Sequence, residues 1–391
     1  MNISAMLERE PFYSVLFETT RSYFRQVHGV EVSVGFKKVD DCKKLYLYYL
    51  PSFIAGEKIT NGMKEFLYSE YNIRGSVLKY IIGKLGVFAV IALHGLAAVK
   101  RFYIGPAKAV KEPIFISPCN RSIRFYDFKN DYVDCMVKEG YRADFMENQM
   151  RFRLSNDYFF VPKVCEYGYR WYRERIMHGN PLARVRDQAA HEKGTVDALS
   201  YMGIIAKDTI QYVDCGEYVR NLRDSIMSML TEFFKSGDDD EGVFVKFIDC
   251  AVRRAEHGEF DIPTVLSHGD LQSGNIWITE QGETIIYDWE TNCRRSVWYD
   301  PATLLWKLHS DAFAPDIHGM VQHDKRFTVN DEKKDYSERQ LKAIAWIIIL
   351  ENTSFYLTDI LQLPLQFGKQ SFQQLGKKLR KQMEMRGSDE T

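Results

Sequence analysis

Asp270, Asn275 and Asp288 are the residues of this sequence whose types and spacing best suit catalysis. Asn275 follows Asp270 by five positions, and Asp288 follows Asn275 by thirteen. One carboxylate can take the proton of an acceptor hydroxyl, while an amide and a second carboxylate offer the hard oxygen ligands that Mg²⁺ prefers. The pattern therefore predicts phosphoryl transfer, with Asp270 as the catalytic residue and Asn275 and Asp288 as metal ligands.

A strand-like segment and a hairpin must hold these side chains in place. The strand-like run from Val265 leads into His268, and the segment NIWITEQGETIIYDWE then reads as a hairpin with Gly282 in its turn. Asp288 comes at the end of the second hairpin strand. The three oxygen-bearing side chains are thus predicted at the ends of adjacent strands.

The amino-acid sequences of these segments, HGDLQSGNIW and YDWE, resemble those of the aminoglycoside phosphotransferase and choline kinase family. That family has H-G-D where protein kinases have H-R-D. Five fixed positions at these spacings arise by chance on the order of once in ten thousand sequences of this length. The resemblance covers roughly residues 113–310. It implies an α+β, bilobal protein-kinase-like fold with a small β-rich N-lobe, a larger helical C-lobe and an extra N-terminal region.

The resemblance also implies an activity and its cofactors. The protein would be a small-molecule kinase that moves the γ-phosphate of ATP to a hydroxyl group, with Mg²⁺ on the phosphates. Lys138, on a β segment, resembles the strand lysine that contacts the phosphates. Glu147, nine residues later in a helical pattern, is its implied ion-pair partner, and Glu139 is the weaker alternative.

Three residues around the catalytic loop have implied supporting roles. His268 packs beneath the loop and orients it, so it is interpreted as structural and not as a base. Asp300, in WYDPATLL, holds the loop by hydrogen bonds, although it also fits a helix N-cap ahead of Pro301. Glu290 would help to hold a metal-bound water.

Two further segments resemble the nucleotide-binding parts of the family. The run SPCNRS occupies the place of the loop that covers the nucleotide, without any G-x-G-x-x-G pattern. Asn120, Arg121 and Ser122 are therefore predicted to contact phosphate oxygens. The run RERIMHGNPL resembles the hinge between the lobes, where adenine would pair with backbone groups around Arg175 and Met177.

Length and charge divide the 391 residues into parts. This length allows two or three domains. The motifs suggest a basic N-terminal extension over residues 1–110, an N-lobe over 111–178 and a C-lobe over 179–391. The extension carries a net charge of +6, from 15 basic and 9 acidic residues, and the remainder carries −7. A total of −1 argues against a nucleic-acid-binding surface.

The acidic remainder favours a cationic acceptor such as an amino sugar, an aminoglycoside or an amino alcohol. An aromatic face for such a cation could come from Trp298, Tyr299, Trp306 and Trp346, although aromatic residues at helical spacing are more often core. A sugar or a glycolipid head group is the other acceptor class that fits.

The most apolar stretch, Leu85–Val99, has two interpretations. It is too short to span a bilayer as a helix, so the favoured interpretation is a buried helix or hairpin. The alternative is a peripheral membrane contact through residues 79–101, whose basic ends would attract anionic lipid. Seven scattered cysteines and the absence of a signal-peptide pattern predict a cytoplasmic protein, with membrane contact at the inner face under the second interpretation.

Two other functions stay open at this point. The chain could phosphorylate protein, although H-R-D, D-F-G and A-P-E are all lacking. It could also be a non-catalytic scaffold with a kinase-like fold at a membrane surface. Lys138, Asp270, Asn275 and Asp288 together argue against the scaffold, because a scaffold needs none of them.

Overall fold

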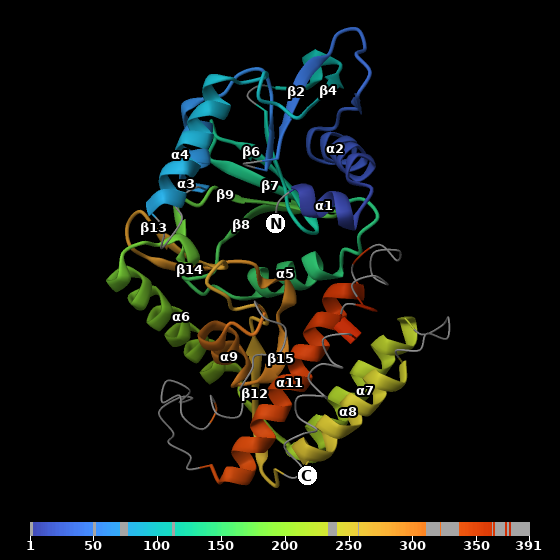
Figure 1. Ribbon diagram of the computed structural model, residues 1–391, viewed down its shortest axis with the longest axis vertical. Helices are drawn as coiled ribbons and strands as arrows, with labels where there is room; N and C mark the ends of the chain where they lie inside the picture. The colour runs from blue at the N-terminus through green and yellow to red at the C-terminus, as the bar shows by residue number, and fades with distance from the viewer. Residues whose placement is uncertain are drawn as a thin grey trace. The chain divides into compact units, whose positions relative to one another are not determined.

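The computed structural model describes residues 3–49, 52–70, 77–111, 114–233, 241–256, 258–309, 321, 336–361, 363, 372–373 and 375–376. The chain forms two compact units (Figure 1). Unit 1 contains Met1–Gly194 and Ile276–Tyr287, and unit 2 contains Thr195–Asn275 and Asp288–Thr391. Sheet dominates unit 1 and helix dominates unit 2, which confirms the predicted α+β class with a β-rich and a helical part.

Unit 1 is built on a nine-stranded sheet with the order β1-β4-β2-β3-β5-β6-β7-β9-β8. All of its neighbouring strands run antiparallel. The strands are β1 (Ser33–Gly35), β2 (Lys43–Tyr48), β3 (Phe53–Ala55), β4 (Lys100–Gly105), β5 (Phe115–Pro118), β6 (Ser122–Asp127), β7 (Tyr132–Val137), β8 (Val164–Gly168) and β9 (Trp171–Arg175).

The N-terminal extension is part of this sheet. Its strand β3 pairs with β5, with Ile54 opposite Ile116. Helices α1 (Ile3–Arg9) and α2 (Phe12–His28) pack with both parts of the sheet in one buried cluster that includes Phe12, Leu47, Ile116 and Met136. The structure thus places no domain boundary at residue 110, because apolar side chains from both sides of that position share one core.

Alternating side chains give the two faces of this sheet different neighbours. Asp134 on β7 accepts a hydrogen bond of 2.9 Å from the hydroxyl of Tyr23 on α2, so α2 covers this face. Glu174 on β9 points to the opposite face, where it forms a buried ion pair of 2.6 Å with Arg153 on α5 (Asp144–Ser155). Helix α5 therefore covers the second face.

The remaining elements of unit 1 include a second, three-stranded sheet of order β10-β13-β14. The β13–β14 hairpin is the one predicted from the sequence, and its Ile286 N–H donates to Phe160 O at 2.8 Å. These elements are α3 (Asn61–Glu70), α4 (Val77–Ala92), η1 (Ala107–Ala109), β10 (Gly179–Pro181), η2 (Leu182–Arg184), β13 (Ile276–Thr279) and β14 (Thr284–Ile286).

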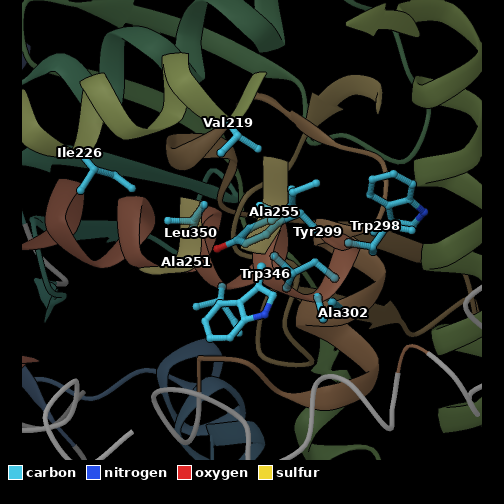
Figure 2. Close-up of a cluster of buried hydrophobic side chains, with 14 of the residues drawn as sticks. Val219, Ile226, Ala251, Ala255, Trp298, Tyr299, Ala302, Trp346 and Leu350 are labelled. Carbon is cyan, nitrogen blue, oxygen red and sulfur yellow. The ribbon is translucent and has the colours of Figure 1, made fainter. Parts of the chain in front are cut away.

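Unit 2 packs its helices around a three-stranded sheet of order β11-β12-β15. Figure 2 shows its core, in which Trp298, Tyr299 and Trp346 are buried among aliphatic side chains. The elements are α6 (Gln188–Thr209, which begins in unit 1), β11 (Gln211–Asp214), α7 (Cys215–Phe233), α8 (Glu241–Glu256), β12 (Asp261–Ser267), η3 (Trp289–Thr291), β15 (Cys293–Ser296), α9 (Tyr299–Trp306) and α11 (Glu338–Leu361).

This core corrects one expectation from the sequence. Trp298, Tyr299, Trp306 and Trp346 are each less than a tenth exposed, so they form no open aromatic face for a cation.

Among the described helices, α11 alone has the length and composition to cross a membrane, and 67% of its most apolar stretch is buried. Its apolar residues belong to the same core.

Candidate active site

A tight turn after β12 presents Asp270. The strand ends at Ser267, and Gly269 then adopts a left-handed backbone conformation with φ of +86°. A Cβ atom at this position would come within 2.4 Å of both Thr291 O and an Arg295 guanidinium nitrogen. Glycine is therefore required here, both for the conformation and for the close approach.

Asp300 and His268 hold the backbone of this turn. Asp300 is buried, and its carboxylate accepts hydrogen bonds from the N–H groups of His268 (2.7 Å) and Gly269 (2.9 Å). The fully buried His268 packs against the ring of Trp289, and its Nδ1 accepts the N–H of Asp270 at 3.2 Å. The side chains of Asp300 and His268 thus fix the backbone of Asp270 and of the two residues before it.

The carboxylate of Asp270 is held from both sides. Its Oδ1 lies 2.6 Å from Nδ1 of His309, and its Oδ2 accepts hydrogen bonds of 3.0 Å from Asn275 and Gln272. Burial acts to raise the pKa of Asp270, but the hydrogen bond and charge of His309, helped by His268, outweigh burial and lower that pKa. Asp270 is therefore an oriented, ionised carboxylate that retains some exposure.

His309 is the residue of this site that the sequence analysis missed. It follows α9, stacks on the ring of Phe355 with centroids 4.0 Å apart, and places Nε2 3.1 Å from the hydroxyl of Tyr299. It lies 39 residues after Asp270, outside every recognisable motif. Only the folded chain brings the two together, so no sequence signal could have found it.

Replacing His309 with phenylalanine should change the pH dependence of activity. The ring would still stack on Phe355, but Asp270 would lose the partner that lowers its pKa. We expect the acidic limb of the kcat/KM profile to move to higher pH, because Asp270 would then protonate at higher pH. The profile of a His178→Phe control, altered at an exposed histidine of unit 1, should not move. An unmoved limb in His309→Phe would contradict this positioning role.

Asn275 and Asp288 have the donor atoms for a magnesium ion. The Asn275 amide nitrogen donates to Asp270 O at 2.9 Å and to its Oδ2 at 3.0 Å, so the amide oxygen must point the other way. Asp288 takes a left-handed conformation (φ 68°, ψ 56°) that is uncommon for residues other than glycine, and Glu290 follows it on η3.

The described residues contain no group of three or more His, Cys, Asp or Glu side chains that could hold a metal. Mg²⁺ is commonly held by one or two protein oxygens together with substrate phosphates and waters, so the sparse donor set of Asn275 and Asp288 fits it.

The predicted ion pair between Lys138 and Glu147 is wrong. The ammonium of Lys138, just after β7, lies 2.6 Å from the carboxylate of Glu10, and both side chains are 1% exposed. It also donates to Asn120 O at 3.1 Å, while Glu10 accepts the hydroxyl of Tyr141 at 2.7 Å. Glu147 is exposed. The physical reason is the sheet: Lys138 reaches toward the α1–α2 face, whereas α5, which carries Glu147, covers the other face.

Removing only one member of the Lys138–Glu10 pair should strongly destabilise the protein. Lys138→Met leaves a carboxylate buried without a cation, which costs about 3–5 kcal/mol of unfolding free energy. The double variant Glu10→Gln/Lys138→Met removes both charges and should recover most of that loss. Urea unfolding of the three proteins measures it. Equal stability of the single and double variants would refute the pairing.

Arg124 on β6 is an unpaired cation on the opposite face of the sheet. It lies across from Cys135 of β7 in the strand register, and so faces the side that α5 covers. Its Nε is buried without a hydrogen-bond partner. No ion pair or side-chain hydrogen bond of the described residues involves its guanidinium, although arginine stays charged at all relevant pH values.

Arg124 also lies near the end of the β13–β14 hairpin. Burial and the Glu174 carboxylate raise the pKa of Tyr287, while the charges of Arg124 and Arg153 act to lower it. The unpaired guanidinium is thus close enough to act on Tyr287. The next residue in the chain is Asp288, one of the two candidate metal ligands.

The other predicted nucleotide contacts lie in two turns of unit 1. Asn120 and Arg121 form the β5–β6 turn and Ser122 begins β6, but the guanidinium of Arg121 is buried over the ring of Phe145, 5.4 Å away. The side chain of Arg175, at the end of β9, stacks over the ring of Tyr132.

Met177 follows β9 by two positions, and Ile176, between β9 and Met177, donates its N–H to Asp131 O.

Within unit 2 the structure brings together His268, Asp270, Asn275, Asp300 and His309. The nucleotide contacts proposed for Asn120, Arg121, Ser122, Arg175 and Met177 in unit 1 stay predictions.

Comparison with known proteins gives similarity at the level of structure. No family model matches the sequence, and no curated protein matches it either. An ethanolamine kinase of Plasmodium vivax is 14% identical, with a TM-score of 0.45 over 82% of this chain and 95% of its own. A choline kinase of Streptococcus pneumoniae is also 14% identical, with a TM-score of 0.46 over 67% of this chain and 91% of its own.

An aminoglycoside phosphotransferase of Streptomyces rimosus is 14% identical as well, with a TM-score of 0.40 over 61% of this chain and 92% of its own.

Proposed function

We propose that this protein is a phosphotransferase that moves the γ-phosphate of ATP to a hydroxyl group of a small molecule. One observation carries the proposal: the ionised carboxylate of Asp270 is partly exposed, and Asn275 and His309 fix its orientation. A base placed in this way, next to an amide oxygen and a second carboxylate in the sequence pattern described, suits the deprotonation of an alcohol during phosphoryl transfer.

The residues around Asp270 have separate roles in this mechanism. Asp270 accepts the proton of the acceptor hydroxyl, while Asp300 and His268 keep its backbone in place. Asn275 and Asp288 would hold Mg²⁺, which when bound neutralises phosphate charge, and Glu290 would orient a water beside it.

In this proposal Arg124 takes the part that the family resemblance implies for Lys138. Phosphoryl transfer needs a fixed cation beside the nucleotide phosphates. Lys138 cannot readily provide it, because its charge is already matched by Glu10. Arg124 has an unmatched charge beside Tyr287, and a guanidinium can bind phosphate oxygens in pairs. We therefore assign Arg124 to the phosphates of the nucleotide.

The acceptor stays at the level of a class. The net charge of −7 beyond residue 110 supports an amino sugar, an aminoglycoside or an amino alcohol, and a sugar or glycolipid head group is the alternative. The seven free cysteines support a cytoplasmic site of action. A protein kinase and a non-catalytic scaffold are the rival functions. A protein kinase would use Asp270 but would not act on a small acceptor, and a scaffold would need neither.

ATP consumption by the purified full chain with Mg²⁺ separates these functions. The acceptor panel contains amino sugars, aminoglycosides, amino alcohols, neutral sugars and a protein mixture. Turnover that depends on one small acceptor, with a phosphorylated product found by mass spectrometry, is the expected result. Turnover with protein alone would favour the protein kinase. Binding of ATP without turnover on any acceptor would favour the scaffold.

A further inference from the structure

Helix α4 exposes a wide apolar face. Six large aliphatic or aromatic side chains on it are between 48% and 67% exposed: Val77, Leu78, Ile81, Ile82, Leu85 and Phe88. Spacings of three and four residues place them along one side of the helix. Leu93, Leu96 and Val99 continue the exposed apolar surface beyond its end. The favoured sequence interpretation, a buried helix over this stretch, is therefore wrong for this face.

The opposite side of α4 anchors it to unit 1. Val87 is 1% exposed and packs in a cluster with Met63, Leu67 and Phe115. Lys84 donates to the carbonyl of Tyr68 on α3. The helix is thus attached by the side that carries Val87, and it presents outward a row of apolar side chains, whereas such residues on an ordinary protein surface are scattered singly.

The chain segment that carries this face has charges of one sign only. From 71 to 110 the chain has no Asp or Glu, and it has six basic residues. Near one end of the apolar face, the guanidinium of Arg186 lies 4.4 Å from the ring centre of Tyr80, and the ammonium of Lys84 lies 5.4 Å from it. Beyond the other end, the exposed Arg101 donates to Gly95 O at 3.0 Å. Cations therefore border the apolar surface at both ends, and a tyrosine lies beside them at one end.

We propose that α4 binds the surface of an anionic lipid bilayer. Its 16 residues extend about 24 Å, which is less than the ~30 Å hydrocarbon core, so the helix would lie in the plane of the interface. Its apolar face would enter the acyl boundary while the bordering cations meet lipid phosphates. A second copy of the chain is a poorer occupant, because a symmetric contact through this face would bring two basic, acid-free segments together.

Vesicle flotation of the full chain tests this proposal independently of phosphoryl transfer. Vesicles of phosphatidylcholine alone are compared with vesicles containing about one third phosphatidylglycerol, each at low and high salt. We expect binding to the anionic vesicles that weakens at high salt. The double variant Ile82→Glu/Leu85→Glu should bind at least about tenfold more weakly, because it removes two apolar anchors and adds two negative charges.

A matched control carries Leu154→Glu and Val196→Glu, two exposed apolar positions on α5 and α6. It should float like the unaltered protein, and equal thermal unfolding of all three proteins confirms that each is folded. The proposal is overturned if the unaltered protein stays with the phosphatidylcholine baseline, or if the α4 variant floats as well as the control. A dimer by light scattering that the α4 variant dissociates, without flotation, would assign the face to self-association instead.

Discussion

Replacing Asp270 with asparagine is expected to lower kcat for acceptor phosphorylation by about 10²–10⁴-fold. Asparagine has nearly the same shape and can still accept a hydrogen bond from His309, but it cannot take a proton from the acceptor. ATP affinity should stay close to that of the unaltered protein, because the proposed phosphate contact, Arg124, is unchanged. Steady-state kinetics with the small acceptor that supports turnover in the panel, and nucleotide titration calorimetry, measure both quantities.

Asp261→Asn is the matched control, since Asp261 is an exposed carboxylate on β12, the strand that leads to the catalytic turn. It should retain full activity. Turnover of Asp270→Asn within a few-fold of the control would remove Asp270 from the reaction and with it the proposed mechanism.

Replacing Arg124 with methionine is expected to weaken ATP binding by about 10–100-fold, the loss of a hydrogen-bonded charge pair. The same change should leave the nucleotide-free protein as stable as before or more stable, since it removes a charge that has no partner on the described residues. Arg124→Lys should recover part of the affinity, because it restores the charge without the paired hydrogen bonds. Calorimetry and urea unfolding give the two readouts.

Opposite movements of affinity and stability are what distinguish a ligand-binding cation from a structural one. If Arg124→Met lost stability and kept its ATP affinity, Arg124 would be part of the core of unit 1. The control is Glu10→Gln/Lys138→Met, which removes the buried ion pair on the other face of the sheet. That variant should bind ATP with unchanged affinity, and a loss there would return the phosphate contact to Lys138.

The catalytic turn could be predicted because its information is local. His268, Asp270, Asn275 and Asp288 lie within 21 positions, and the strand and hairpin that carry them have clear sequence signals. A short segment with a fixed spacing leaves few ways to fold. The α+β class was implied by the family resemblance of these same segments, and the structure has it.

Contacts between distant segments could not be predicted in this way. Glu10 meets Lys138 across 128 positions, and His309 meets Asp270 across 39. Which face of a strand carries Arg124 depends on the register of the whole sheet, and a single-residue shift would reverse it. The exposure of α4 was missed for a related reason: hydropathy reports the character of a helix but not its neighbours.

The β13–β14 hairpin belongs to unit 1, and this has a consequence for the order of folding during synthesis. Unit 1 needs Ile276–Tyr287, yet its preceding segment ends at Gly194, 93 positions before Tyr287. At roughly 5–20 residues per second the ribosome takes about 5–20 s to supply the missing strands. During that interval Gly179–Pro181, which becomes β10, has no β13 to pair with. The first unit to emerge therefore cannot be finished until the Thr195–Asn275 part of the second has been made.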